Sequence, residues 1–85
     1  MAGGSVVAGV HEDLILAARN GNASQMQALL RKGADVDTVD ADGNTLLMLA
    51  TREGHPEVTR LLLANRARLN RVNRHGESAL MLAAI

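Results

Sequence analysis

The chain is organised around residues 40–72, DADGNTLLMLATREGHPEVTRLLLANRARLNRV, because the sequence on both sides repeats this stretch. A shift of 33 residues in either direction aligns it with identical or similar residues. The backward pairs are Leu47 with Leu14, Ala50 with Ala17, Gly54 with Gly21, Leu62 with Leu29 and Ala67 with Ala34; the forward pairs are Gly43 with Gly76, Thr45 with Ser78, Leu47 with Leu80, Met48 with Met81 and Ala50 with Ala83. A fixed period of this length indicates an array of stacked structural units.

Two short helical patterns occur in the first unit. The first pattern begins at Glu12 and ends at Gly21, since Gly takes the left-handed conformation at a helix end without a steric penalty. We expect Ser24 to cap the second helix and Gly33 to end it. Two helices joined by a short Gly-containing connection form an antiparallel helical hairpin.

The middle unit predicts the same pair of helices. Thr45 is placed to cap a helix over residues 46–52, which Gly54 terminates. Pro56 stands at the start of the next helix, where a missing N–H costs nothing, and Asn65 ends it. In the third unit Ser78 caps a last helix that runs to Ile85.

Extended arms connect the units, at residues 34–44 and again at 66–77. Asp42-Gly43 is a tight-turn dipeptide, so we expect the tip of the first arm to fold back on itself. The sequence thus predicts an all-α solenoid of helix-turn-helix units joined by extended, β-hairpin-like arms.

Composition restricts the classes of function. The chain has no Phe, Tyr or Trp, so it has no aromatic platforms for single-stranded nucleic acid, and its 9 basic and 9 acidic side chains give no basic field. It has no Cys for disulfides, and no apolar run is long enough to span a membrane. We expect a cytoplasmic protein that binds no nucleic acid and does not insert into membranes, with residues 1–10 as a flexible lead-in to a domain over 11–85.

The motifs of the middle unit are similar to those of the ankyrin repeat. Residues 40–55, DADGNTLLMLATREGH, resemble the opening pattern Asp/Asn-x-x-Gly-x-Thr-Pro-Leu-His-x-Ala-Ala-x-x-Gly-His of that family. Residues 61–70, LLLANRARLN, and 29–37, LLRKGADVD, resemble its Leu-Leu-Leu-x-x-Gly-Ala-Asp-Val-Asn tail. The resemblance implies repeats at about 11–39 and 40–72 and a partial repeat at 73–85. It also implies a protein-interaction module or scaffold, with no catalysis and no cofactor.

Two departures from the family pattern bear on packing. Met48 and Met81 stand where the family has His, so apolar filling replaces imidazole hydrogen bonds between repeats. The third unit stops after its first helix, which leaves an apolar face without a polar cap. We expect either a truncated or partial array, or a face that self-associates or completes a longer array. The residues of that face are Leu80, Met81, Leu82 and Ile85.

The charges of the two arms differ in sign. Residues 1–45 carry six acids and three bases, whereas residues 46–85 carry three acids and six bases. At corresponding positions, Asp35 is matched by Arg68, and the second arm adds Arg71 and Arg74. One interpretation is charge pairing between stacked arms, at about 0–1 kcal/mol for each exposed pair. The other is a bipolar strip that orients a partner carrying both signs.

Metal and catalytic sites find little support in the sequence. If Gly43 were position 6 of an EF-hand loop, position 12 would be Leu49, which cannot bind calcium. His11, His55 and His75 are too scattered for a metal site, and Ser24 and Ser78 are helix caps in this interpretation. We therefore expect a binding protein with no metal and no catalytic residues.

Partners of ankyrin repeats lie along the arm tips and the exposed side of the first helices of each repeat. By position, the resemblance implies that a protein partner contacts ten residues of this chain. They are Arg19, Asn20, Ala41, Asp42, Asn44, Arg52, Glu53, Arg74, His75 and Glu77.

Overall fold

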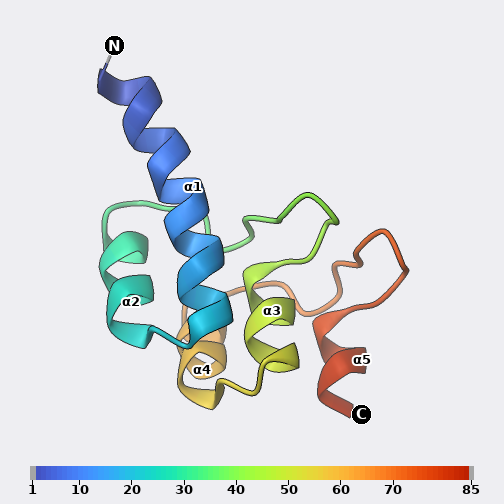
Figure 1. Cartoon of the computed structure of the whole chain (residues 1–85). Coiled ribbons are helices and arrows are strands. Elements are labelled where there is room, and N and C mark those ends of the chain that lie inside the picture. The colour runs from blue at the N-terminus through green and yellow to red at the C-terminus, as the bar shows by residue number, and fades with distance from the viewer. Residues whose placement is uncertain (1, 85) are drawn as a thin grey trace.

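Five helices and two projecting arms make up the chain (Figure 1). The computed structural model describes the backbone of residues 2–84 and the side chains of residues 11–83. The helices are α1 (Ala2–Asn20), α2 (Ala23–Arg31), α3 (Leu46–Arg52), α4 (Pro56–Ala64) and α5 (Ala79–Ala84). Within these residues there is no β-strand; the arms contain only isolated antiparallel bridges, Val39 with Thr45 and Val72 with Ser78. The predicted all-α repeat fold is confirmed.

The helices form two rows (Figure 1). One row contains α1, α3 and α5, in which α3 contacts both neighbours. The other contains α2 and α4, which also contact each other, and each packs on the helix that precedes it in the chain. This arrangement is the linear stack predicted from the period, because each unit contacts only the next one along the chain.

The first helix starts earlier than expected. We placed its start at Glu12 and took residues 1–10 as a flexible lead-in, but α1 begins at Ala2. Residues 2–10 contain no Pro, and adding a residue to an existing helix costs far less than starting a new one. The boundary between a lead-in and a repeat domain at residue 11 stays a prediction.

Side-chain caps define the starts of three helices. The Thr45 hydroxyl accepts a hydrogen bond from the Met48 amide at 3.1 Å, and the Ser78 hydroxyl accepts one from the Met81 amide at 3.2 Å, as predicted. The expected cap at Ser24 is wrong. Asn22 caps α2 instead, accepting from the Gln25 amide at 3.1 Å, because it is the only residue left between Gly21 and the start of the helix.

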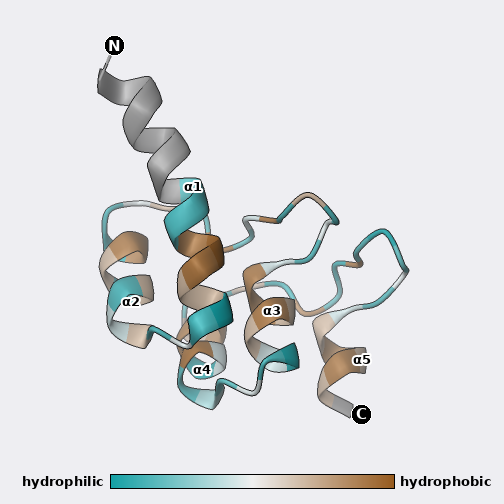
Figure 2. Cartoon of the chain, in the orientation of Figure 1, coloured by the Kyte–Doolittle hydropathy of each residue, from teal (hydrophilic) through white to brown (hydrophobic). Residues whose placement is uncertain are grey.

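A continuous aliphatic core runs through both rows of helices. All residues from Leu46 to Ala50 in α3 are buried, since α1, α4 and α5 surround this short helix (Figure 2). The other members of the core come from every helix of the stack. They are Leu14, Ala17, Ala18, Met26, Leu29, Val58, Leu62 and Ala79. Met48, at the position where the family pattern has His, is fully buried as apolar filling.

Candidate functional site

The tip of each arm is held by one polar side chain at its base. In the first arm, Asp40 Oδ1 accepts hydrogen bonds from the backbone amides of Asp42 and Asn44, both at 2.9 Å. In the second arm, Asn73 Oδ1 accepts from the amides of His75 and Glu77 at 2.9 and 3.0 Å. Asp40 and Asn73 are separated by one period, so both tips are closed in the same way.

Asp40 is charged at neutral pH for a structural reason. Burial raises the pKa of its carboxyl, but hydrogen bonds from Asn44 and from the Asp42 amide, together with the charge of Arg19, lower it further. The net effect is a pKa below the usual value for aspartate. A carboxylate that accepts several hydrogen bonds favours its ionised form. The oxygens of Asp40 are therefore committed to holding the arm.

Neutral hydrogen bonds join the two arms. Asn73 Nδ2 donates to Asn44 Oδ1 at 2.8 Å, and the Arg74 amide donates to the Asp42 carbonyl at 3.0 Å. Asn44 and Asn73 are only 6% and 5% exposed. The expected exposure of Asn44 on the binding surface is therefore wrong: its side chain lies between the arms and links the units.

Opposite charges face each other across the arms, as the first of the two interpretations predicted. Arg74 Nη1 lies 3.1 Å from Asp42 Oδ1, and Arg68 Nε lies 3.8 Å from Asp37 Oδ2. The Arg68 amide also donates to Asp37 Oδ1 at 3.0 Å. Asp35, the residue one period before Arg68, instead accepts a hydrogen bond from the Asp37 amide. The acidic arm thus lies beside the basic one, with partners shifted from strict correspondence.

Two further ion pairs connect first helices to the arm that follows. Arg19 Nη2 in α1 lies 3.8 Å from Asp40 Oδ2, and Arg52 Nη2 in α3 lies 3.2 Å from Glu77 Oε1. The two arginines are one period apart. Both are exposed, so each pair contributes at most about 1 kcal/mol. Their effect is to order long side chains along one surface.

His55 locks the second unit onto the first. Its Nε2 lies 2.7 Å from the carbonyl oxygen of Arg19. The imidazole ring also occupies the space that a Cβ on Gly21 would need, and Gly21 has a φ of 73°. Gly21 is thus required both for its backbone conformation and for the close approach of the ring.

Eight of the ten residues predicted to bind a partner are exposed. Glu77 is half-buried, and Asn44 is buried. We call the eight exposed residues the recognition strip: Arg19, Asn20, Ala41, Asp42, Arg52, Glu53, Arg74 and His75. The structure brings Asp42 into contact with Arg74, and it links Arg19 and Arg52 to the bases of the arms. The sequence interpretation missed the role of Asn73, which its correspondence with Asp40 could have revealed.

The predicted self-association residues differ in exposure. Leu80 and Met81 are 62% and 54% exposed, whereas Leu82 is half-buried and packs against the core. Ile85 lies outside the described residues. Val72, in the second arm, is also 59% exposed.

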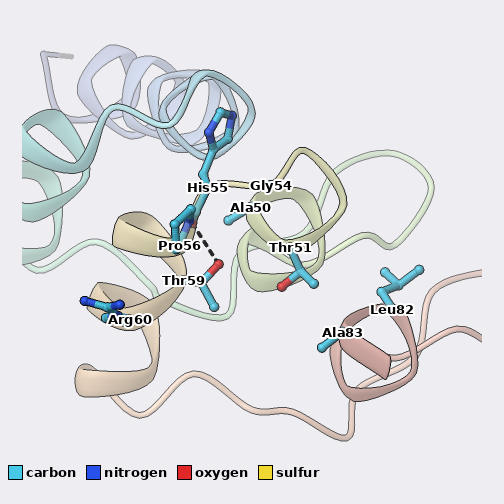
Figure 3. Close-up of a pocket in the computed structure, with 9 residues that line it drawn as sticks. All are labelled: Ala50, Thr51, Gly54, His55, Pro56, Thr59, Arg60, Leu82 and Ala83. Atoms are coloured by element: carbon cyan, nitrogen blue, oxygen red, sulfur yellow. Dashed lines mark hydrogen bonds between the residues drawn. The ribbon is translucent and has the colours of Figure 1, made fainter. Parts of the chain in front are cut away.

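An open groove of about 440 Å³ lies between α4 and α5, across the end of α3 (Figure 3). The Thr59 hydroxyl inside it donates to the His55 carbonyl oxygen at 2.9 Å. We call this the α4–α5 groove. Its lining residues are Ala50, Thr51, Gly54, His55, Pro56, Thr59, Arg60, Leu82 and Ala83.

Helical hairpins stacked at a fixed period, with hydrogen-bonded arms projecting from one row, define a helical repeat protein. A comparison with protein families matches residues 14–85 to ankyrin repeats (3 copies). The chain therefore belongs to the ankyrin repeat family, as its motifs predicted. Ankyrin repeats are in general protein–protein interaction modules and are typically not catalytic. No curated protein matches the chain, and no helix of residues 2–84 is long and apolar enough to cross a membrane.

Proposed function

We propose that the chain is a cytoplasmic protein-interaction module whose protein partner binds the recognition strip. The observation that carries the proposal is the prior ordering of this surface. Side-chain and backbone hydrogen bonds close both arm tips and join the arms to each other. Little chain ordering then accompanies binding, and rigid surfaces lose less free energy when a partner associates.

The proposed partner carries charges of both signs. Asp42 and Glu53 place acids on the strip, and Arg52 and Arg74 place bases beside them. Because several of these charges are paired within the chain, a partner gains correct orientation and faster association from them more than affinity. Such a module acts by recognition alone, with no cofactor, metal or nucleic acid.

A pull-down with charge-reversed variants tests the strip. We expect the combined substitutions Arg52→Glu and Arg74→Glu to lower recovery of specific partners about tenfold, as expected for a loss of roughly 1.4 kcal/mol. Arg31→Glu is the matched control, because Arg31 is exposed at the end of α2 and lies outside the strip. Circular dichroism establishes that each variant is folded. Unchanged recovery with the double variant would show that the strip is not the binding site.

Self-association is the second candidate function. It is supported by the exposure of Leu80 and Met81, whose counterparts Leu47 and Met48 are 1% and 0% exposed in the preceding unit. An apolar surface of this kind associates with another apolar surface or completes a longer array. Sedimentation over a wide concentration range tests it, with Leu80→Glu as the variant expected to abolish association. A strict monomer at the highest concentration would contradict this candidate.

A further inference from the structure

The repeat provides its own template for the α4–α5 groove. One period earlier, the position that corresponds to this groove is filled by α4, which packs on α2 and α3. We propose that the α4–α5 groove binds a short amphipathic helix with the chemistry of α4, supplied by another polypeptide. The groove lies apart from the recognition strip, so this site is independent of the function proposed above.

Burial of corresponding residues supports the site. Thr51 and Thr59 in the groove are half-buried, whereas their counterparts Ala18 and Met26 are both 0% exposed. Ala83, on the α5 side of the groove, is exposed, whereas its counterpart Ala50 is 0% exposed. The groove therefore has the shape of an interface between units, with the covering helix missing from the described residues.

The contact that locks α4 in place also has a vacant counterpart. His55, which precedes α4, lies over Gly21 and contacts the Arg19 carbonyl oxygen. One period later, Gly54 has no atom within 4 Å of the position where a Cβ would stand. No hydrogen bond from the described residues reaches the Arg52 carbonyl oxygen. A histidine at the start of an incoming helix would cover Gly54 and donate to this oxygen.

The chemistry of α4 specifies the occupant. His55 is followed by Pro56 at the first helical position, and Val58 and Leu62 are the two residues of the helix that are fully buried. The occupant thus carries His, Val and Leu at positions i, i+3 and i+7, an apolar stripe along one face of a helix. A folded second copy cannot offer this stripe, because its own Val58 and Leu62 are inside its core. A helix that is free on another protein can offer it.

A synthetic peptide tests the proposal directly. The probe is residues 53–65, EGHPEVTRLLLAN, carrying a fluorescent label and titrated with the full chain while anisotropy is recorded. A helix this short is marginal in water, so binding must order the peptide and is expected to be weak but saturable. Replacing the histidine of the peptide by alanine should weaken binding about tenfold, and a scrambled peptide should not bind.

Variants of the chain locate the site. Ala83→Glu, which places a charge in the groove, should weaken peptide binding at least about tenfold. Ala28→Glu is the matched control, since Ala28 is also an exposed helical alanine but lies on α2. Thr59→Met, which copies the counterpart Met26, should strengthen binding. Arg52→Glu with Arg74→Glu should leave it unchanged, which separates this site from the recognition strip.

Three results would overturn the proposal. The first is the absence of saturable binding at any practical concentration of the chain. The second is binding that Ala83→Glu and Ala28→Glu affect equally. The third is a dimer of the chain that Ala83→Glu dissociates and the peptide does not, which would show that a second copy fills the groove.

Discussion

At the scale of single residues, Arg66 is the clearest departure from the repeat. It has a φ of 66°, a positive value that no other non-glycine residue from 2 to 84 adopts, and its counterpart Gly33 has a φ of 96°. The left-handed conformation costs an L-residue about 1 kcal/mol, whereas Gly adopts it freely. We predict that Arg66→Gly increases the free energy of unfolding by roughly 0.5–1 kcal/mol, measured by urea unfolding followed by circular dichroism.

The control for this prediction is Arg60→Gly. Arg60 is an exposed residue inside α4, where Gly should lower the free energy of unfolding by about 1 kcal/mol. Opposite signs for the two substitutions would attribute the gain to the backbone of Arg66. A loss of stability with Arg66→Gly would contradict the prediction.

Asp40 makes a second prediction at the same scale, because Asn73 performs its role in the second arm with a neutral amide. Since its folded pKa lies below the usual value, Asp40 stabilises the fold above the ordinary aspartate pKa of about 3.9. This contribution is lost as pH falls through the lower, folded pKa. We predict that Asp40→Asn keeps the arm but removes this dependence, so that the stability difference between the two proteins shrinks as pH falls.

Urea unfolding at a series of pH values between about 6 and 2 measures this difference. Asp40→Ala is the control that also removes the acceptor, and it should cost about 1–3 kcal/mol at neutral pH because two backbone amides lose their partner. Parallel stability curves for Asp40→Asn and the unmodified chain would argue against the assigned role of the charge.

At the scale of elements, the turns between helices carry the contacts that register one unit on the next. Gly21 and Gly54 both have positive φ, but only Gly21 lies under an imidazole ring. We predict that Gly54→Ala costs about 1 kcal/mol from its backbone alone. Gly21→Ala should cost at least about twice as much, since it must also displace His55.

A double-mutant cycle with His55→Ala separates these two costs. Removing the ring should recover part of the destabilisation caused by Gly21→Ala and none of that caused by Gly54→Ala. The readout is again the free energy of unfolding. Equal costs for the two glycine substitutions would mean that the ring moves aside freely.

The helix ends of the middle unit could be predicted from sequence because caps act over a few residues. Thr45, Gly54 and Pro56 each determine a boundary through their own backbone or side chain. The start of α2 could not be decided in this way, since Asn22 and Ser24 are both good caps. Only the point at which α1 ends selects between them.

Contacts between elements limited the prediction of the site. The burial of Asn44 depends on Asn73 in the next arm, and no local pattern indicates how closely two arms approach. The charge asymmetry of the arms was visible in the sequence, but the pairing of Arg68 with Asp37 was not. Asp35 is engaged by the Asp37 amide, which is a detail of turn geometry.

At the scale of the whole molecule, position along the stack decides what a residue contributes. Leu47 and Leu80 occupy the same place in consecutive units, yet Leu47 is 1% exposed and Leu80 is 62% exposed. The difference arises because α3 packs between α1, α4 and α5, whereas α5 packs only on α3 among the described helices. The same sequence motif therefore serves as core in one unit and as surface in the next.

This difference predicts very unequal effects of one chemical change. Leu47→Ala should lower the free energy of unfolding by about 2–5 kcal/mol, because it removes a buried side chain and leaves a cavity. Leu80→Ala should cost less than about 0.5 kcal/mol in the monomer, since its side chain is already largely in water. Urea unfolding of both variants at low protein concentration provides the comparison. A large cost for Leu80→Ala that grows with protein concentration would instead reveal self-association through α5, because only an assembly would bury that side chain.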